Sequence, residues 1–178
     1  LEVNRGDTIC KVNTVLPTDK IAARISLLEG SKFPLKNAFE LSFLLGTADI
    51  NGRVYLLETD MLKPGQSSFA RIHLRSPVAA KIGDNFILRR ISPQDTIGGG
   101  IVLDTEVIMG RKAKSRQLEI LGARRDISPE TLIRSEFMKH EKVSYKDLSR
   151  NIPFSKDDLD RELKRLSENR EVKVMGDS

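Results

Sequence analysis

The sequence of 178 residues contains no tryptophan, one cysteine and two histidines, and aromatic residues make up only 5% of it. The core is therefore expected to be mostly aliphatic. Because Cys10 has no second cysteine to pair with, an intrachain disulfide and a cysteine-based zinc site are excluded, and a reducing compartment suits the chain. No apolar run approaches the roughly 18–20 residues of a membrane-spanning helix, so no membrane partner is expected.

Motifs for nucleotide binding and for catalysis are also missing. A phosphate loop requires G-x-x-x-x-G-K-[ST], whose backbone amides and lysine hold phosphates, and the sequence contains no such run. The string D-x-x-G occurs at Asp49–Gly52 and Asp95–Gly98, but two fixed positions recur by chance. His73 and His140 have no neighbouring cysteine and no ligand-like spacing. We therefore expect no catalytic residue, metal ligand or cofactor in this chain, and no enzyme.

The composition does contain what a folded, basic protein needs. Hydrophobic residues make up 39% and charged residues 31% of the sequence, and the formal net charge is +5. The length is enough for one large domain or two small ones. A mild excess of positive charge permits a nucleic-acid partner without requiring one.

Residues 1–105 follow the pattern of antiparallel β-structure. Apolar residues alternate with polar or small ones over 21–27 and 67–75, which is the period of half-buried strands. The pair Asn51-Gly52 between two apolar runs predicts a hairpin turn, because a type I′ turn requires positive φ at both central positions. Pro64-Gly65 predicts another turn. Several short strands with regular turns and no helical period favour a closed barrel.

A basic stripe is expected on the outer face of strand 67–75. Phe69 is the one aromatic residue on this face. A basic stripe with little aromatic interleaving suits contact with a nucleic-acid backbone more than base stacking, and an ordinary solvated strand face is the alternative. The candidate residues, including those that follow closely in the sequence, are Arg71, His73, Arg75, Lys81, Arg89 and Arg90.

The stretch 77–104 holds the most unusual local sequence. A turn at Gly83-Asp84 precedes a short apolar strand that ends in two arginines, and a Ser-Pro loop then leads to three glycines at 98–100. Successive glycines allow another backbone to approach closely. Beside the arginines they suit a phosphate or RNA-backbone contact, and a barrel corner where strands crowd explains them equally well.

Residues 106–127 are expected to form a basic connector. This segment either contacts RNA or is a solvated linker or a helix with a charged face. Its basic residues are Arg111, Lys112, Lys114, Arg116, Arg124 and Arg125, against the acids Glu106, Glu119 and Asp126.

Residues 128–178 predict three short helices followed by a strand. Serines at 128, 144 and 155 are placed as N-caps, and Val172 and Val174 are expected to begin the strand. Three helices and a strand outline a winged helix, cut short in this chain. Acids crowd the start of the third helix, so a packing or spacer role fits it at least as well as reading nucleic acid. Its candidate RNA contacts are Lys164 and Arg165.

Two runs of residues carry a resemblance to a known family. The segment from Met61-Leu62-Lys63-Pro64-Gly65 to Thr96-Ile97-Gly98-Gly99-Gly100-Ile101-Val102 resembles the third, β-barrel domain of elongation factor Tu-like translation factors. The form Arg89-Arg90-Ile91-Ser92-Pro93-Gln94-Asp95-Thr96-Ile97-Gly98-Gly99-Gly100 resembles the selenocysteine-specific elongation factor of bacteria.

The resemblance implies an α+β multidomain chain in which an antiparallel β-barrel is followed by a small helical winged-helix domain. The expected boundaries are 1–10 for the tail of a preceding barrel, 11–105 for the barrel, 106–127 for the connector and 128–178 for the winged-helix domain. We expect a fragment of a longer protein, whose GTPase domain lies outside it. GTP and Mg are then ligands of the parent protein only.

The resemblance also implies a function. The family delivers selenocysteyl-tRNA to the ribosome at recoded stop codons, in the cytoplasm, and its third domain holds the tRNA backbone. By motif, Arg89, Thr96 and Gly98 match tRNA-contacting positions, whereas Arg90 stands where elongation factor Tu usually has an acid. The mRNA hairpin of this family is bound by the last winged helices, which are not expected in this chain.

Two other functions stay open. The chain could be a protein-contacting or ribosome-contacting module of another translational GTPase. A winged-helix DNA-binding regulator is the other alternative, which the mixed charge of the third helix disfavours.

Overall fold

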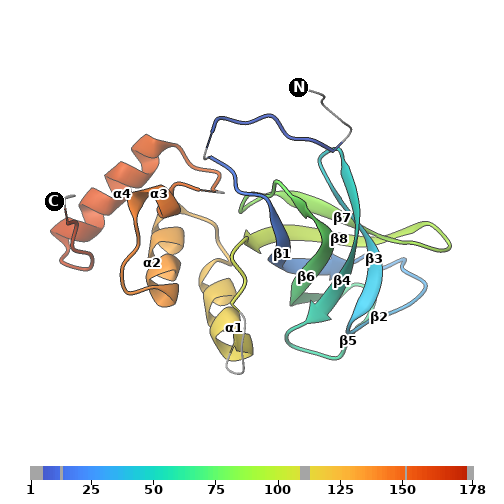
Figure 1. The fold of residues 1–178 in the computed structure, drawn as a ribbon. Coiled ribbons are helices and arrows are strands. Elements are labelled where there is room, and N and C mark those ends of the chain that lie inside the picture. Colours follow the sequence, from blue (N-terminus) through green and yellow to red (C-terminus); the bar gives the residue numbers. More distant parts are fainter. Residues whose placement is uncertain (1–5, 13, 109–112, 151, 176–178) are drawn as a thin grey trace.

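The structure is a computed structural model, and it describes residues 6–12, 14–108, 113–150 and 152–175 (Figure 1). A β-barrel is followed by helices that lie to one side of it. The strands are β1 (Thr18–Leu27), β2 (Leu35–Lys36), β3 (Phe39–Leu45), β4 (Ala48–Leu56), β5 (Met61–Leu62), β6 (Ser67–Val78), β7 (Asn85–Arg90) and β8 (Asp95–Asp104). The helices are α1 (Ala113–Ala123), α2 (Pro129–Lys139), α3 (Tyr145–Leu148) and α4 (Lys156–Glu168).

Six strands close the barrel in the order β1-β6-β4-β3-β7-β8, with antiparallel pairing throughout, while β2 and β5 pair separately. Alternate residues such as Ile21, Ala23 and Ile25 point into a continuous core. That core is mostly aliphatic, with the rings of Phe43 and Phe86 packed at 4.7 Å between centroids. The closed antiparallel barrel expected from the alternation is confirmed.

The predicted hairpin turn at Asn51-Gly52 is wrong. Leu45 pairs with Ala48, so the turn between β3 and β4 lies at Gly46-Thr47, where Gly46 has a φ of +58°. Gly52 lies inside β4 instead, opposite Leu74 of β6. A Cβ at Gly52 would lie 3.0 Å from the carbonyl oxygen of His73, so close strand approach explains this glycine. The turns predicted at Pro64-Gly65 and Gly83-Asp84 are present, with positive φ at both glycines.

The helical part forms its own small core. Ile133, Leu148, Leu159 and Leu166 are buried together from α2, α3 and α4. The three predicted serine N-caps are confirmed, because each serine side chain accepts a hydrogen bond from the backbone N–H three residues on. None of the helices in the described ranges has the length and apolar character needed to cross a lipid bilayer.

The strand expected to begin at Val172 is absent from the described residues, which end at 175. Residues 172–175 carry no strand assignment, and Val172 packs against the core of the helical part. A strand requires a partner for its backbone groups, and no strand is assigned anywhere in 128–150 or 152–175.

Helix α1 lies within the predicted basic connector and covers part of the barrel (Figure 1). Its Leu121 is buried with Ala22, Phe69 and Leu103, which point outward from the barrel strands, and with Leu57, which directly follows β4. The helical alternative for the connector is therefore the one observed. Phe69 shares the outer side of β6 with the basic stripe as predicted, but it is only 5% exposed under α1 and offers no free ring to a base.

Candidate nucleic-acid interface

Arg89 lies on the outer side of the barrel at the junction of three strands. It pairs with Ser42 of β3 and with Thr96 of β8. A shallow hollow of about 100 Å³ lies beside it, lined by Ser42, Asp49, Asn51, Arg89, Arg90, Ile91 and Gln94. Arg89 is half-buried and lines the hollow, whereas Thr96 is exposed on the paired strand β8 and is not among the residues that line it. The structure thus brings together two of the three residues that the resemblance singled out.

Arg90 has a different environment from its neighbour. Its guanidinium carbon lies 4.8 Å from the ring centroid of Phe33 and 5.6 Å from that of Phe39. Such cation–π contacts hold an arginine in place and stabilise it by about 0.5–1 kcal/mol at partly exposed sites. Arg90 therefore braces the loop that carries Phe33 against β3, next to the hollow beside Arg89.

Gly98 is buried and lies between two strands, opposite Leu27 of β1 and Leu88 of β7. A Cβ on Gly98 would lie 2.2 Å from the carbonyl oxygen of Ser26, and one on Gly100 would lie 2.2 Å from that of Arg24. No side chain fits there, so the glycines let β8 approach β1 and close the barrel. Of the two explanations for the glycine triplet, strand crowding is the one that the geometry supports. A direct RNA contact through Gly98 is not proposed.

The basic stripe on β6 is present but lies on another side of the barrel. In the closed order β1-β6-β4-β3-β7-β8, strand β6 is three positions away from β7 in either direction. Arg71 and His73 are half-buried on the outer side, and His73 packs on Tyr55 at 4.8 Å between ring centroids. Burial lowers the pKa of His73, and nearby Lys20 and Arg71 lower it further, against an opposite effect of Asp19. The stripe and Arg89 therefore form two surfaces rather than one.

Arg75 and Lys81 are the other two basic residues predicted for the stripe, and both lie in different environments from Arg71 and His73. The Nε of Arg75 donates to Glu40 Oε1 at 2.8 Å, so its charge is largely neutralised. Lys81 is exposed in the loop between β6 and β7, where its backbone N–H donates to Asp84 Oδ2 at 2.8 Å. These two residues lie at the margins of the β6 surface.

The secondary RNA contacts predicted outside the barrel divide into several environments. Lys114 and Lys164 are exposed, and Arg111 and Lys112 lie outside the described residues. Arg116 donates from Nη2 to the carbonyl oxygens of Met138 and Lys139 at 2.8 and 3.0 Å, so it caps the C-terminus of α2. Arg165 pairs with Glu162 at 2.6 Å and Glu130 at 2.7 Å. The last two arginines are thus explained by packing between helices.

A buried ion network at the end of β8 joins the barrel to α1 and α2, and the sequence reasoning missed it. Arg124 is fully buried, and its Nη1 lies 3.0 Å from Asp104 Oδ1. Lys139 Nζ lies 2.7 Å from the same oxygen, and Glu136 pairs with both cations. Two acids and two bases balance one another, as buried charges must. Arg124 also donates to Ser135 Oγ at 2.7 Å and to the carbonyl oxygen of Leu103 at 3.0 Å.

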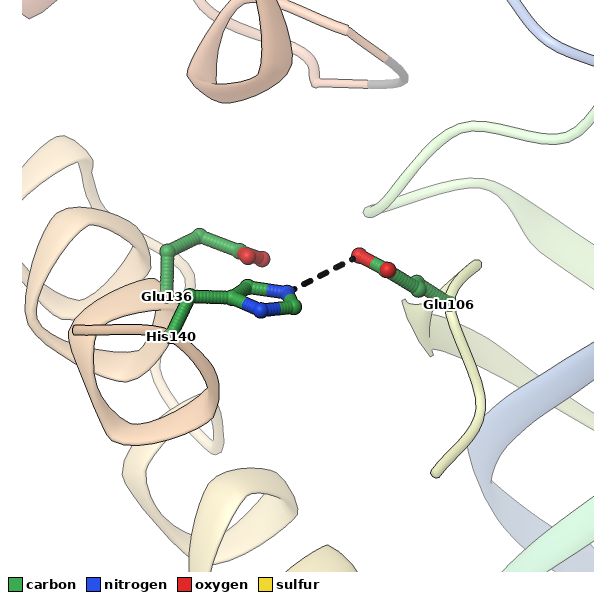
Figure 2. Close-up of side chains that lie close together, drawn as sticks. All are labelled: Glu106, Glu136 and His140. Atoms are coloured by element: carbon green, nitrogen blue, oxygen red, sulfur yellow. Dashed lines mark ion pairs between the residues drawn. The ribbon is translucent and has the colours of Figure 1, made fainter. Parts of the chain in front are cut away.

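At the edge of the network, Glu106, Glu136 and His140 converge (Figure 2). The Nε2 of His140 lies 3.6 Å from a carboxylate oxygen of Glu106, which reaches across from the end of the barrel. Their ligand atoms lie within 4.8 Å of one another. Glu136 is already paired with Arg124 and Lys139, so Glu106 and His140 extend the buried ion network. The network links the barrel to α2, and we call it the ionic joint.

The ionic joint predicts a dependence of stability on pH. Burial by itself would raise the pKa of Asp104, but Arg124 and Lys139 outweigh it and hold the pKa below its usual value of 3.8. A depressed pKa contributes stability above pH 3.8 that is lost as the pH falls through the folded value. We expect Asp104→Asn to cost about 2–3 kcal/mol at neutral pH. Urea unfolding from pH 7 to pH 2 should show this difference shrink below pH 4; a constant difference would contradict the assignment.

The architecture defines the class: a closed six-stranded antiparallel barrel followed by a small helical domain. The family model described as the β-barrel domain of the selenocysteine-specific elongation factor matches residues 22–108. A selenocysteine-specific elongation factor from Desulfomicrobium baculatum is 29% identical over 122 residues, which cover 67% of this chain and 19% of that protein. Over residues 22–108 the barrel of this chain is therefore similar to the β-barrel domain of selenocysteine-specific elongation factors. The chain spans about a fifth of the length of this relative.

Proposed function

We propose that this chain acts within a translation factor that delivers selenocysteyl-tRNA to the ribosome at recoded stop codons, and that its barrel holds the tRNA backbone. The proposal rests on the similarity of the barrel to that domain and on one geometric observation. Arg89 and Thr96, which match tRNA-contacting positions by motif, lie directly opposite each other on β7 and β8, and Arg89 lines a shallow hollow. A cation and a hydroxyl in this arrangement suit phosphate oxygens.

The helical part has a positioning role in this proposal. Arg165 in α4 is paired with acids, and the first turn of α4 carries Asp157 and Asp158, which repel phosphate. The ionic joint and the packing of α1 fix α2 against the barrel. The helices therefore serve as a spacer between the tRNA-holding barrel and an arm that binds the mRNA hairpin.

Arg89→Ala tests the tRNA-binding role. We expect the variant to bind selenocysteyl-tRNA about tenfold more weakly, and the slope of log affinity against log salt to fall by about one, because one phosphate contact is lost. The measurement is a filter-binding or fluorescence titration of the intact factor at several salt concentrations.

Arg161→Ala is the matched control, since Arg161 is an exposed arginine on α4 whose side chain is 80% accessible. This variant should keep the wild-type affinity and slope. If Arg89→Ala behaves like Arg161→Ala, the barrel does not hold tRNA through this surface. The alternative, a surface for ribosomal protein or another protein partner, would then be favoured.

A further inference from the structure

The β6 surface contains side-chain nitrogens that have no hydrogen-bond partner in the part of the chain that the structure describes. Arg71 Nε and Nη2, together with His73 Nε2, are shielded from solvent and lack a hydrogen-bond partner. A shielded donor without an acceptor costs about 1–3 kcal/mol. The two residues lie on the same side of β6, two positions apart, so their unpartnered nitrogens are neighbours.

Nε and Nη2 lie along one edge of the guanidinium. This edge donates two parallel hydrogen bonds, either to two oxygens of one group or to a single oxygen. The same edge is engaged at Arg116 and Arg165, whereas Arg90 and Arg150 each have an Nε without a partner in the described residues. Arg116 uses it on the carbonyl oxygen of Met138, at 3.3 and 2.8 Å. Arg165 uses it on Glu162, at 3.0 and 2.6 Å. Among the arginines that the structure describes, Arg71 is the one with both Nε and Nη2 shielded and without a partner, which suits this edge to an oxyanion.

The charges around this edge are mainly positive. Lys20 of β1 and Arg53 of β4 pair with His73 from the two flanking strands. Glu40 is occupied, because it pairs with Arg75 and lies 3.9 Å from Arg53. Asp19 is the acid that acts electrostatically on His73. The row Lys20–His73–Arg53 crosses three strands, about 10 Å, which corresponds to about three phosphates along one strand of a duplex.

We propose that Arg71 and His73, flanked by Lys20 and Arg53, form a phosphate-binding site that takes the backbone of an RNA strand. The site lies three strands away from Arg89, so it is a second RNA surface rather than part of the proposed tRNA contact. It goes beyond the proposed function, because it gives the barrel two RNA-facing sides. Phosphate fits better than a single carboxylate since Lys20 and Arg53 place a cation on each side of His73, beyond the reach of one oxyanion.

The two histidines of the chain allow a direct test. Imidazole nitrogen NMR of the 178-residue chain should show a shift of the His73 signal when inorganic phosphate is added. His140 is the internal control, because it lies in the ionic joint, paired with Glu106. Chloride at equal ionic strength should shift neither signal, and Arg71→Met should abolish the response of His73. No change at His73 with phosphate or with a short RNA duplex would overturn the proposal.

Affinity for a short RNA duplex separates this site from the tRNA surface. We expect Arg71→Met to weaken duplex binding about tenfold and to lower the salt slope by about one. Arg71→Lys keeps the charge but lacks the two-donor edge, so it should retain the slope and lose about threefold in affinity. Arg161→Met should have no effect. Arg71→Met must weaken binding in the Arg89→Ala background as well; if it does not, the two residues share one site and the second surface is refuted.

Discussion

Arg124→Met will lower the free energy of unfolding by about 3–5 kcal/mol, because it removes one cation from a buried network of four charges. Arg124 is fully buried and bonded to Asp104, Glu136, Ser135 and the carbonyl oxygen of Leu103. Methionine fills a similar volume but donates no hydrogen bond, so Lys139 is left as the one cation of the network for both Asp104 and Glu136. Urea unfolding followed by circular dichroism measures the loss.

Two further variants distinguish the network from general packing. Arg125→Met is the matched control, since Arg125 is exposed next to Arg124 and its guanidinium lies 5.8 Å from the ring of Phe69. It should change stability by less than about 1 kcal/mol. Arg124→Lys retains the charge and should be intermediate, because a lysine cannot reach three acceptors in one plane. A loss below 1 kcal/mol for Arg124→Met would show that the network does not hold the joint.

The network has a consequence for how the chain works. Its members come from the end of β8, from the turn that directly follows α1 and from α2, so it fixes three parts of the chain at one point. Arg116 adds a second fixed point by capping α2 from α1. A helical part anchored in this way cannot swing freely relative to the barrel. In the proposed function, the distance between the tRNA-holding surface and the following arm is therefore set by the joint.

Local sequence signals predicted the parts of the fold that depend on local forces. Alternation of apolar residues indicated the barrel strands, because an inward-facing residue recurs at every second position whatever the strand order. Ser128, Ser144 and Ser155 were identifiable as N-caps, because a cap bonds only to its own helix. Turn prediction failed at Asn51-Gly52, where the close approach of β6, a tertiary constraint, decides where glycine is needed.

The functional surfaces depend on contacts that sequence proximity does not reveal. Arg71 and Arg89 lie only 18 positions apart in the sequence, which suggests one basic surface. The strand order places them on different sides of the barrel. Arg124 was read as part of a basic connector, since a charged residue is usually exposed. Its partners, Asp104 and Glu136, come from other elements, and only the tertiary structure shows that the three meet.

Gly98→Ala will destabilise the barrel by about 3 kcal/mol or more, the upper end of what overpacking costs. The added Cβ would lie 2.2 Å from the carbonyl oxygen of Ser26 and 3.1 Å from the Cα of Leu27. All of these neighbours are backbone, so a side-chain movement cannot relieve the clash. Strands β1 and β8 would have to separate where Leu27 and Gly98 pair. Equilibrium unfolding in urea measures the effect.

Gly122→Ala is the control, because Gly122 lies in α1 and a Cβ there would have no atom within 4 Å. The free energy of unfolding of that variant should be unchanged or should rise by up to about 1 kcal/mol, since alanine has a higher helix propensity than glycine.

The Gly98→Ala variant also distinguishes the two explanations of the glycine triplet, strand crowding and contact with RNA. If Gly98 only closes the barrel, the folded fraction of Gly98→Ala will bind tRNA with wild-type affinity. A variant that folds with wild-type stability but loses tRNA binding would show instead that the glycine backbone itself contacts RNA.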